Sequence, residues 1–202
     1  MNKKGFTLVE ILVAMFLTGL VMAGLVGLWV SSTNFASSGK QELLLKNMFS
    51  VAEMKLYRDI SEATYADTAN AISCGSVSGK PATSFLVLYK NFSPDKDGTG
   101  GCLALPLTVS GYSVVAYCSV IVDTNVPAIC RMERSCACGV LPAACTGGSA
   151  CGMVMKYISS GPSASVAQNT VNVNFSAATT VGKENRPLQL DFNKTFSFMG
   201  VE

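Results

Sequence analysis

The sequence predicts an α+β protein in which a long N-terminal helix packs on a C-terminal antiparallel β-sheet. Three observations support this prediction: an apolar run at residues 6–30, helical spacing of apolar residues within 31–66, and short β-branched and aromatic segments throughout 67–202. A helix laid on an antiparallel sheet is one of the few stable layer arrangements. Residues 1–5 precede the apolar run.

The apolar run extends from Phe6 to Val30, and Glu10 is its only charged residue. As a helix it would rise roughly 37 Å, enough to cross a hydrocarbon core of ~30 Å. Lys3 and Lys4 precede the run and favour a cytoplasmic N-terminus. A secretory signal peptide would have a shorter apolar core of ~7–15 residues, and a soluble core helix is rarely apolar on all sides. The run is therefore predicted to cross a membrane once.

Glu10 is a carboxylate inside this apolar run, and ionisable residues in membrane segments are rare and usually functional. The run contains no Lys, Arg or His that could pair with it. A cut between Gly5 and Phe6 would create a positive α-amine on Phe6. Because Phe6 and Glu10 lie about one turn apart on one rigid rod, that amine would reach Glu10 of a neighbour shifted along the axis. Offset contacts of this kind do not close, so they build helical filaments.

The segment KKGFTLVEILVAM resembles the prepilin peptidase site of the type IV pilin and type II secretion pseudopilin superfamily. The resemblance implies a leader peptide at residues 1–5 that is cleaved after Gly5, methylation of the new N-terminus at Phe6, and a role for Glu10 in assembly. It also implies a pilin-like fold. The expected partners are prepilin peptidase and other pilins or pseudopilins of a helical filament. The expected location is the bacterial inner membrane, with a single pass and a cytoplasmic N-terminus, followed by a periplasmic or extracellular filament.

Beyond the polar stretch 31–39, apolar residues recur at steps of three and four. They are Leu45, Phe49, Ala52, Leu56, Ile60 and Ala63. This spacing predicts an amphipathic helix from Lys40 to about Ala66 that continues the membrane segment. The run VAEMKLYRDISEAT within it resembles the corresponding stretch of J-type minor pseudopilins and W-type minor pilins, which implies a minor subunit.

Five later segments are predicted strands because they are rich in β-branched and aromatic residues and are separated by Gly, Ser, Pro and Asn. They are residues 84–90, 112–122, 152–158, 170–176 and 188–192. The last two are expected to be a hairpin or adjacent strands. The cysteine-rich segment 130–151 is expected to be a loop held by disulfide bridges.

Eight cysteines lie beyond the membrane run, on the side expected to be oxidising, and an even number there predicts a disulfide set. They are Cys74, Cys102, Cys118, Cys130, Cys136, Cys138, Cys145 and Cys151. The sequence does not choose among their pairings. A zinc or iron–sulfur site is the alternative, but the spacing in CACGVLPAACTGGSAC fits no common template. We expect no metal and no cofactor.

The stretch DKDGTGG offers a second metal alternative, because Asp95 and Asp97 could supply oxygen ligands to calcium. An EF-hand loop needs glycine at its sixth position and glutamate at its twelfth. Here Gly98 is fourth and Pro106 is twelfth. A polar turn is the preferred interpretation, and the calcium alternative stays open.

Composition argues against several function classes. The chain has no histidine for general acid–base work, and no phosphate-binding loop or nucleotide fingerprint is present. Without residues 1–5 it would carry 13 basic and 13 acidic side chains, so nothing indicates electrostatic binding of nucleic acid. The favoured interpretation is therefore a structural subunit and not an enzyme. The alternatives are a filament-tip module that contacts a surface, a secreted protein or DNA through the cysteine-rich loop, and a membrane-anchored redox protein using Cys136 and Cys138.

Overall fold

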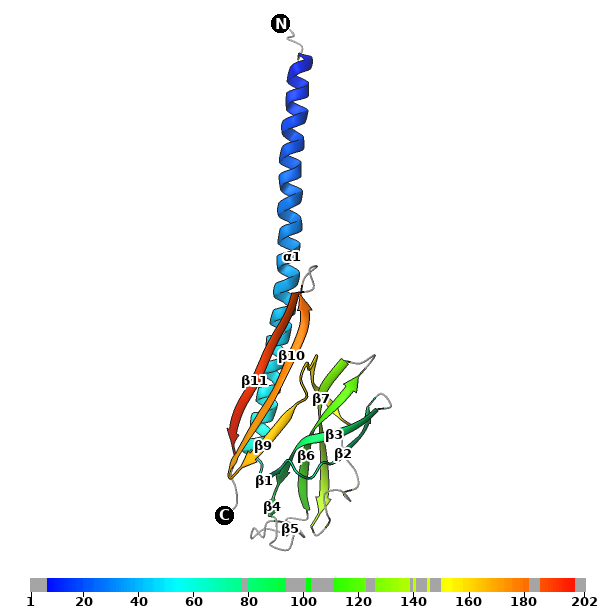
Figure 1. The fold of residues 1–202 in the computed structure, drawn as a ribbon, viewed down its shortest axis with the longest axis vertical. Coiled ribbons are helices and arrows are strands. Elements are labelled where there is room, and N and C mark those ends of the chain that lie inside the picture. Colours follow the sequence, from blue (N-terminus) through cyan, green and yellow to red (C-terminus); the bar gives the residue numbers. More distant parts are fainter. Residues whose placement is uncertain are drawn as a thin grey trace. The chain divides into compact units, whose positions relative to one another are not determined.

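A computed structural model of the chain shows one long helix followed by antiparallel strands, so the predicted α+β, pilin-like arrangement is confirmed (Figure 1). The structure describes residues 7–77, 80–93, 101–102, 111–122, 126–138, 140, 145, 150–181 and 186–198. The chain divides into two compact units. One unit comprises Met1–Leu43 with Thr180–Arg186, and the other comprises Leu44–Thr179 with Pro187–Glu202.

Helix α1 extends from Leu8 to Ser61 without interruption. The polar stretch 31–39 does not break it, because no proline occurs there and hydroxyls bond back to carbonyls of the preceding turn. Thr33 Oγ1 donates to the carbonyl of Val30 at 3.0 Å, and Ser37 Oγ donates to that of Asn34 at 2.9 Å. The helix ends before the expected Ala66, because the Thr64 amide instead donates to the Tyr89 carbonyl of a strand at 2.8 Å.

The first unit contains the apolar part of α1. Among the described residues, α1 is the one helix whose length and composition would allow it to cross a membrane. Its large apolar side chains between Leu8 and Val30 are 42% to 76% exposed. An apolar surface of this extent requires lipid or neighbouring apolar helices around it.

The second unit contains most of the strands, and the strand pairs whose register the structure describes are all antiparallel. A six-stranded sheet has the order β1-β3-β6-β7-β8, with β2 also paired to β3; a second sheet has the order β11-β10-β9, and β4 pairs with β5. The strands are β1 (Tyr65–Asp67), β2 (Ser73–Val77), β3 (Lys80–Lys90), β4 (Phe92–Ser93), β5 (Gly101–Cys102), β6 (Gly111–Val122), β7 (Val126–Ala137), β8 (Gly152–Lys156), β9 (Ser163–Ala167), β10 (Thr170–Val181) and β11 (Arg186–Ser197).

Each of the five predicted strands coincides with an observed one: β3, β6, β8, β10 and β11. The expectation that 130–151 is a loop was wrong for its first part, because residues 130–137 belong to β7. Strand β7 pairs with β6 along its whole length, from Val122↔Val126 to Gly111↔Ala137, and with β8 on its other side. Two-sided pairing and burial on both faces remove the simple polar alternation that marks a half-exposed strand.

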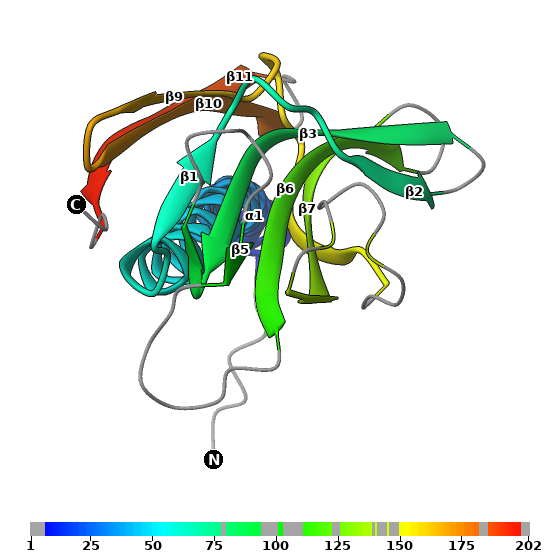
Figure 2. The same cartoon turned by 90° about the horizontal axis from the view of Figure 1, so that it is seen from below.

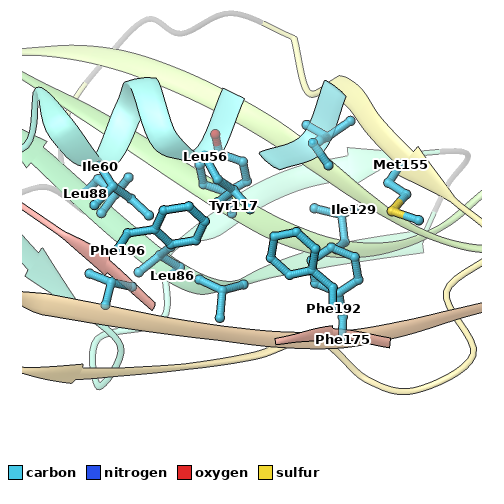
Figure 3. Packing of buried hydrophobic residues seen from close by; sticks show 14 of the residues in the cluster. Leu56, Ile60, Leu86, Leu88, Tyr117, Ile129, Met155, Phe175, Phe192 and Phe196 are labelled. Carbon is cyan, nitrogen blue, oxygen red and sulfur yellow. The ribbon is translucent and has the colours of Figure 1, made fainter. Parts of the chain in front are cut away.

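The central strands β3, β6 and β7 are buried on both faces, and successive residues therefore enter different cores. One core lies between the second part of α1, the six-stranded sheet and the three-stranded sheet. Figure 3 shows Leu56 and Ile60 of α1 in this cluster, with Tyr117 of β6 and Phe192 of β11. The opposite face of the six-stranded sheet carries an aromatic and cysteine-rich core, which includes Tyr89, Tyr112, Cys118 and Cys130. Figure 2 shows that β3 and β6 of this sheet are strongly bent.

Candidate functional site

Glu10 lies in the first turn of α1, where it forms a capping box with Thr7. Thr7 directly precedes the helix, and its Oγ1 accepts a hydrogen bond from the Glu10 amide at 3.3 Å. In return Glu10 Oε2 accepts from the Thr7 amide at 2.9 Å and from the Thr7 hydroxyl at 3.0 Å. The pattern T-x-x-E is a recognised signature of helix starts, and sequence reasoning missed it here. The carboxylate thus has a partner within its own helix.

Glu10 also lies at one end of a shallow groove on the surface of α1. The groove is lined by Glu10, Ile11, Ala14, Met15, Thr18, Gly19 and Met22. These residues follow the i, i+4 rows of the helix surface. Three of them, Ala14, Thr18 and Gly19, have small side chains. The Thr18 hydroxyl donates back to the Ala14 carbonyl, which satisfies that hydroxyl within the helix. The arrangement offers an apolar surface for another helix, with a single carboxylate at one end.

Several residues singled out by sequence lie outside what the structure describes. Gly5 and Phe6 precede the first described residue, so the cleavage and methylation sites remain predictions. Asp95 and Asp97 also lie outside the described residues, which leaves the calcium alternative untested. Cys102 has a described backbone in β5, but its side chain is outside the description.

A second polar site, not anticipated from the sequence, ties α1 to the sheet within the second unit. The Asp59 side chain is fully buried and receives hydrogen bonds from three strands. Both Nε and Nη2 of Arg131 donate to it, the latter at 3.0 Å, and the Tyr117 hydroxyl donates at 2.7 Å. Lys90 Nζ lies 3.4 Å from the same carboxylate. Lys90, Tyr117 and Arg131 come from β3, β6 and β7, on the face of the sheet that contacts α1.

The electrostatics of Asp59 follow from this arrangement. Burial acts to raise the pKa of the carboxyl, but hydrogen bonds from Arg131 and Tyr117 and the charges of Arg131 and Lys90 outweigh it, so the pKa lies below its usual value. Burial, followed by the neighbouring Asp59 charge, raises the pKa of the Tyr117 hydroxyl. The hydrogen bond to Asp59 raises the pKa of Arg131 against the opposing effect of burial. The cluster is therefore a charged structural anchor with a fixed protonation state at neutral pH.

A sequence signal for Asp59 was present. Asp59 lies three residues after Leu56 and directly before Ile60, so it falls on the apolar stripe of the amphipathic helix. An acidic residue on a core-facing stripe requires a buried basic or hydroxyl partner. The sequence does not say which strand supplies that partner.

The expected disulfide bonds are present. The described bridges are Cys74–Cys118, Cys130–Cys151 and Cys136–Cys145, with Cα–Cα distances of 6.5, 5.5 and 5.1 Å. Cys138 is also disulfide-bonded, and the part of the chain that the structure describes has no free cysteine. Three sulfurs, of Cys118, Cys130 and Cys151, lie within 4.8 Å of one another, close enough for a metal site. All three are engaged in bridges, so they do not offer thiolate ligands in this state.

Comparison with known families gives one match. Residues 1–26 match the prokaryotic N-terminal methylation motif. Neither a curated protein nor a solved structure matches the chain. The match supports a precursor of the type IV pilin or pseudopilin kind, which is structural rather than catalytic. It implies assembly with other pilins and processing by prepilin peptidase, and together with the apolar helix it fits a membrane-anchored pilin.

Proposed function

We propose that this chain is a minor subunit of a type IV pilus or type II secretion pseudopilus, cut between Gly5 and Phe6 and methylated on Phe6. The observation that carries the proposal is the N-terminal methylation motif at residues 1–26, whose part from Leu8 onward forms the apolar start of the long helix α1. In this proposal residues 1–5 are the leader and 6–30 the membrane and assembly segment. Residues 31–66 contain the amphipathic continuation of the helix, and residues 67–202 form the exported β-rich domain.

Assembly depends on Glu10 in this proposal. In the isolated subunit the capping box supplies hydrogen bonds to the carboxylate but no positive charge. A charged side chain in an apolar layer costs ~2.5 kcal/mol or more on insertion scales. The α-amine of a neighbour's Phe6, entering at the Glu10 end of the groove, would supply the missing charge. The apolar remainder of the groove then packs against the neighbouring helix without fixing its axial position, so the pair sets the offset between subunits.

Two features support a minor role for the subunit. The stretch VAEMKLYRDISEAT resembles J-type minor pseudopilins and W-type minor pilins. Three described bridges, Cys74–Cys118, Cys130–Cys151 and Cys136–Cys145, tie the β-rich domain. A densely bridged domain suits a subunit that is present in few copies and that begins or caps a filament.

The processing step is tested by intact-mass analysis of membrane protein co-expressed with an active prepilin peptidase. We expect loss of residues 1–5 and the gain of one methyl group on the new N-terminus. A Gly5→Leu variant should retain Met1. A matched Gly24→Leu variant should be processed normally, because a side chain at Gly24 meets nothing within 4 Å. Met1 retained on the wild-type membrane form beside an active peptidase would overturn the proposal.

The minor role needs a separate measurement. We expect the chain to be a small fraction of the pilin protein in purified filaments, as measured by quantitative mass spectrometry against labelled peptides. Equal or greater abundance than every other pilin in the same filaments would show a major subunit. The processing result would stand in either case, because it depends only on the N-terminal motif.

A further inference from the structure

Two of the disulfide bridges are neighbours in the six-stranded sheet. Cys118 of β6 and Cys130 of β7 lie directly opposite each other in the strand register. Cys118 is bridged to Cys74 of β2, and Cys130 is bridged to Cys151. The sulfurs of Cys118, Cys130 and Cys151 all lie within 4.8 Å of one another. Each bridge therefore has a sulfur of the other close beside it.

The four cysteines differ in their access to solvent. Cys118 and Cys130 are fully buried, and Cys74 is 6% exposed, whereas Cys151 is only half-buried. Among the three neighbouring sulfurs, that of Cys151 is therefore the one that a small thiol reagent in solution reaches. Attack on the Cys151 sulfur makes Cys130 the leaving thiolate, and that thiolate forms beside the Cys118 sulfur.

We propose that Cys74–Cys118 and Cys130–Cys151 form one exchange-coupled pair, through which reduction at Cys151 releases Cys74. A dithiol attacks Cys151, the Cys130–Cys151 bond breaks, and the second thiol of the reagent resolves the mixed disulfide to leave a Cys151 thiol. The Cys130 thiolate then attacks Cys118, forming Cys118–Cys130 and expelling Cys74 as a thiolate. The dithiol is oxidised by two electrons, and its two protons end on Cys151 and Cys74.

The alternative Cys118–Cys130 bridge fits the existing strands. Directly opposed residues in an antiparallel pair have Cα atoms about 4.5–5.5 Å apart, and disulfides accept about 4.4–6.8 Å. The exchange therefore needs no change of register between β6 and β7. Its structural consequence falls on β2, which loses its covalent tie to β6 and keeps its pairing with β3 and the hydrogen bond that Arg134 of β7 donates to the Ser73 carbonyl. The device converts a redox event at a half-buried cysteine into loss of the covalent tie between β2 and β6.

The third described bridge provides an internal control. Cys136 lies on β7 six residues from Cys130, roughly 20 Å along an extended strand. Cys136 and Cys145 are bridged to each other and do not belong to the three neighbouring sulfurs of Cys118, Cys130 and Cys151. A thiol freed at either position therefore has no bridge of the coupled pair beside it.

The first experiment treats the full-length protein in detergent with limiting dithiothreitol, traps free thiols by alkylation, and maps the cysteines by mass spectrometry. We expect alkylated Cys74 and Cys151 and a Cys118–Cys130 bridge at the earliest stage of reduction. Alkylated Cys130 and Cys151 with an intact Cys74–Cys118 bridge would overturn the proposal.

The second experiment needs no reductant. A Cys74→Ala variant leaves Cys118 without its partner, and the proposal expects this thiol to attack the neighbouring bridge, so that the free thiol is found at Cys151 or Cys130. In the matched Cys145→Ala variant the free thiol should stay at Cys136. A free thiol that stays at Cys118 in folded Cys74→Ala protein would show that the bridges are independent. If this variant fails to fold, the titration of the wild-type protein decides the question alone.

Discussion

Asp59 of α1 and Arg131 of β7 are 72 residues apart in sequence and join helix to sheet through two hydrogen bonds between their side chains. Arg131 Nη2 also donates to Glu133 at 2.8 Å, which orients the guanidinium from its own strand. The helix therefore meets the sheet at a charged point inside an otherwise apolar interface. These hydrogen bonds fix the position of the C-terminal end of α1 along β6 and β7. Apolar contacts alone would define this position less precisely.

Replacement of Arg131 by methionine should destabilise the second unit strongly. Methionine fills much of the same space but leaves the buried Asp59 carboxylate without its main partner. Breaking a buried pair in this way costs roughly 3–5 kcal/mol, and we expect the lower end because Arg131 itself is 17% exposed. Urea unfolding of full-length protein in detergent, followed by near-ultraviolet circular dichroism of the tyrosines, measures the change.

The matched control is Lys194→Met. Lys194 of β11 pairs with Glu53 of α1, the helix that carries Asp59, at an N–O distance of 3.1 Å. The Lys194 and Glu53 side chains are 51% and 43% exposed. Exposed pairs contribute only about 0.2–1 kcal/mol, so this variant should unfold close to the wild type. Equal effects of the two substitutions would mean that the Asp59 cluster does not carry special stability.

The lowered pKa of Asp59 predicts a specific dependence of stability on pH. A carboxyl whose folded pKa lies below its unfolded value of ~3.9 stabilises the folded state fully above that value. The stabilisation is lost as the pH falls from about 4 through the folded pKa, because the unfolded chain then takes up the proton first. Asp59→Asn should therefore lower stability at pH 7 and flatten the decline below about pH 4.

Denaturant midpoints measured from pH 7 to pH 2 check this expectation. Glu53→Gln serves as the control, because Glu53 pairs only with the exposed Lys194 among the contacts described for it. It should keep the wild-type slope. An Asp59→Asn variant that declines as steeply as the wild type below pH 4 would show that other carboxyls dominate acid unfolding.

Gly111 should tolerate no side chain. It lies at the start of β6 opposite Ala137, and a Cβ there would overlap the carbonyl oxygen of Cys136 on β7. Because that oxygen belongs to the backbone of a paired strand, the strands must shift, and we expect Gly111→Ala to cost about 1–3 kcal/mol. Gly161→Ala is the control, since its Cβ meets nothing within 4 Å. The same unfolding assay compares the two, and an unchanged Gly111→Ala protein would contradict the close approach.

The sequence predicted those parts of the fold whose signal is local. Five strands were found because their β-branched and aromatic residues lie between turn-forming residues, and the helix was found from its apolar spacing. Strand β7 was missed because Cys130, Arg131 and Glu133 do not resemble a strand until both neighbouring strands are known. Strand β9, Ser163–Ala167, was missed because short polar residues carry no strong preference.

The sites divide in the same way. The N-terminal motif at residues 1–26 was recognised because its spacing is contained in one short segment, whereas the leader boundary and the role of Glu10 in assembly stay predictions. Asp59 was not, because its meaning depends on Lys90, Tyr117 and Arg131, which only the tertiary fold brings to it. The Thr7–Glu10 capping box is a local pattern that was present and overlooked. It gives Glu10 a role in helix capping that any test of its proposed role in assembly must separate from that role.

Glu10→Ala and Glu10→Gln together separate capping from charge pairing. Glutamine keeps an oxygen that can accept from the Thr7 amide, so it preserves the capping box, but it cannot ionise. Alanine removes both. If Glu10 pairs with the α-amine of a neighbouring Phe6, both variants should be cleaved and inserted normally. Both should then lose co-assembly with partner pilins by at least about tenfold, equivalent to about 1.4 kcal/mol.

The measurement is crosslinking and co-purification of each variant with its partner pilins, normalised to the processed form. Normal assembly of Glu10→Gln beside defective Glu10→Ala would assign Glu10 to helix capping, because only the charge differs between glutamine and glutamate. Normal assembly of both would assign it to an earlier step such as recognition by the peptidase, which the processed fraction of each variant reports. The paired-charge mechanism requires that both variants lose assembly at unchanged processing. Neither alanine nor glutamine carries the negative charge that would pair with the ammonium group of the neighbouring Phe6.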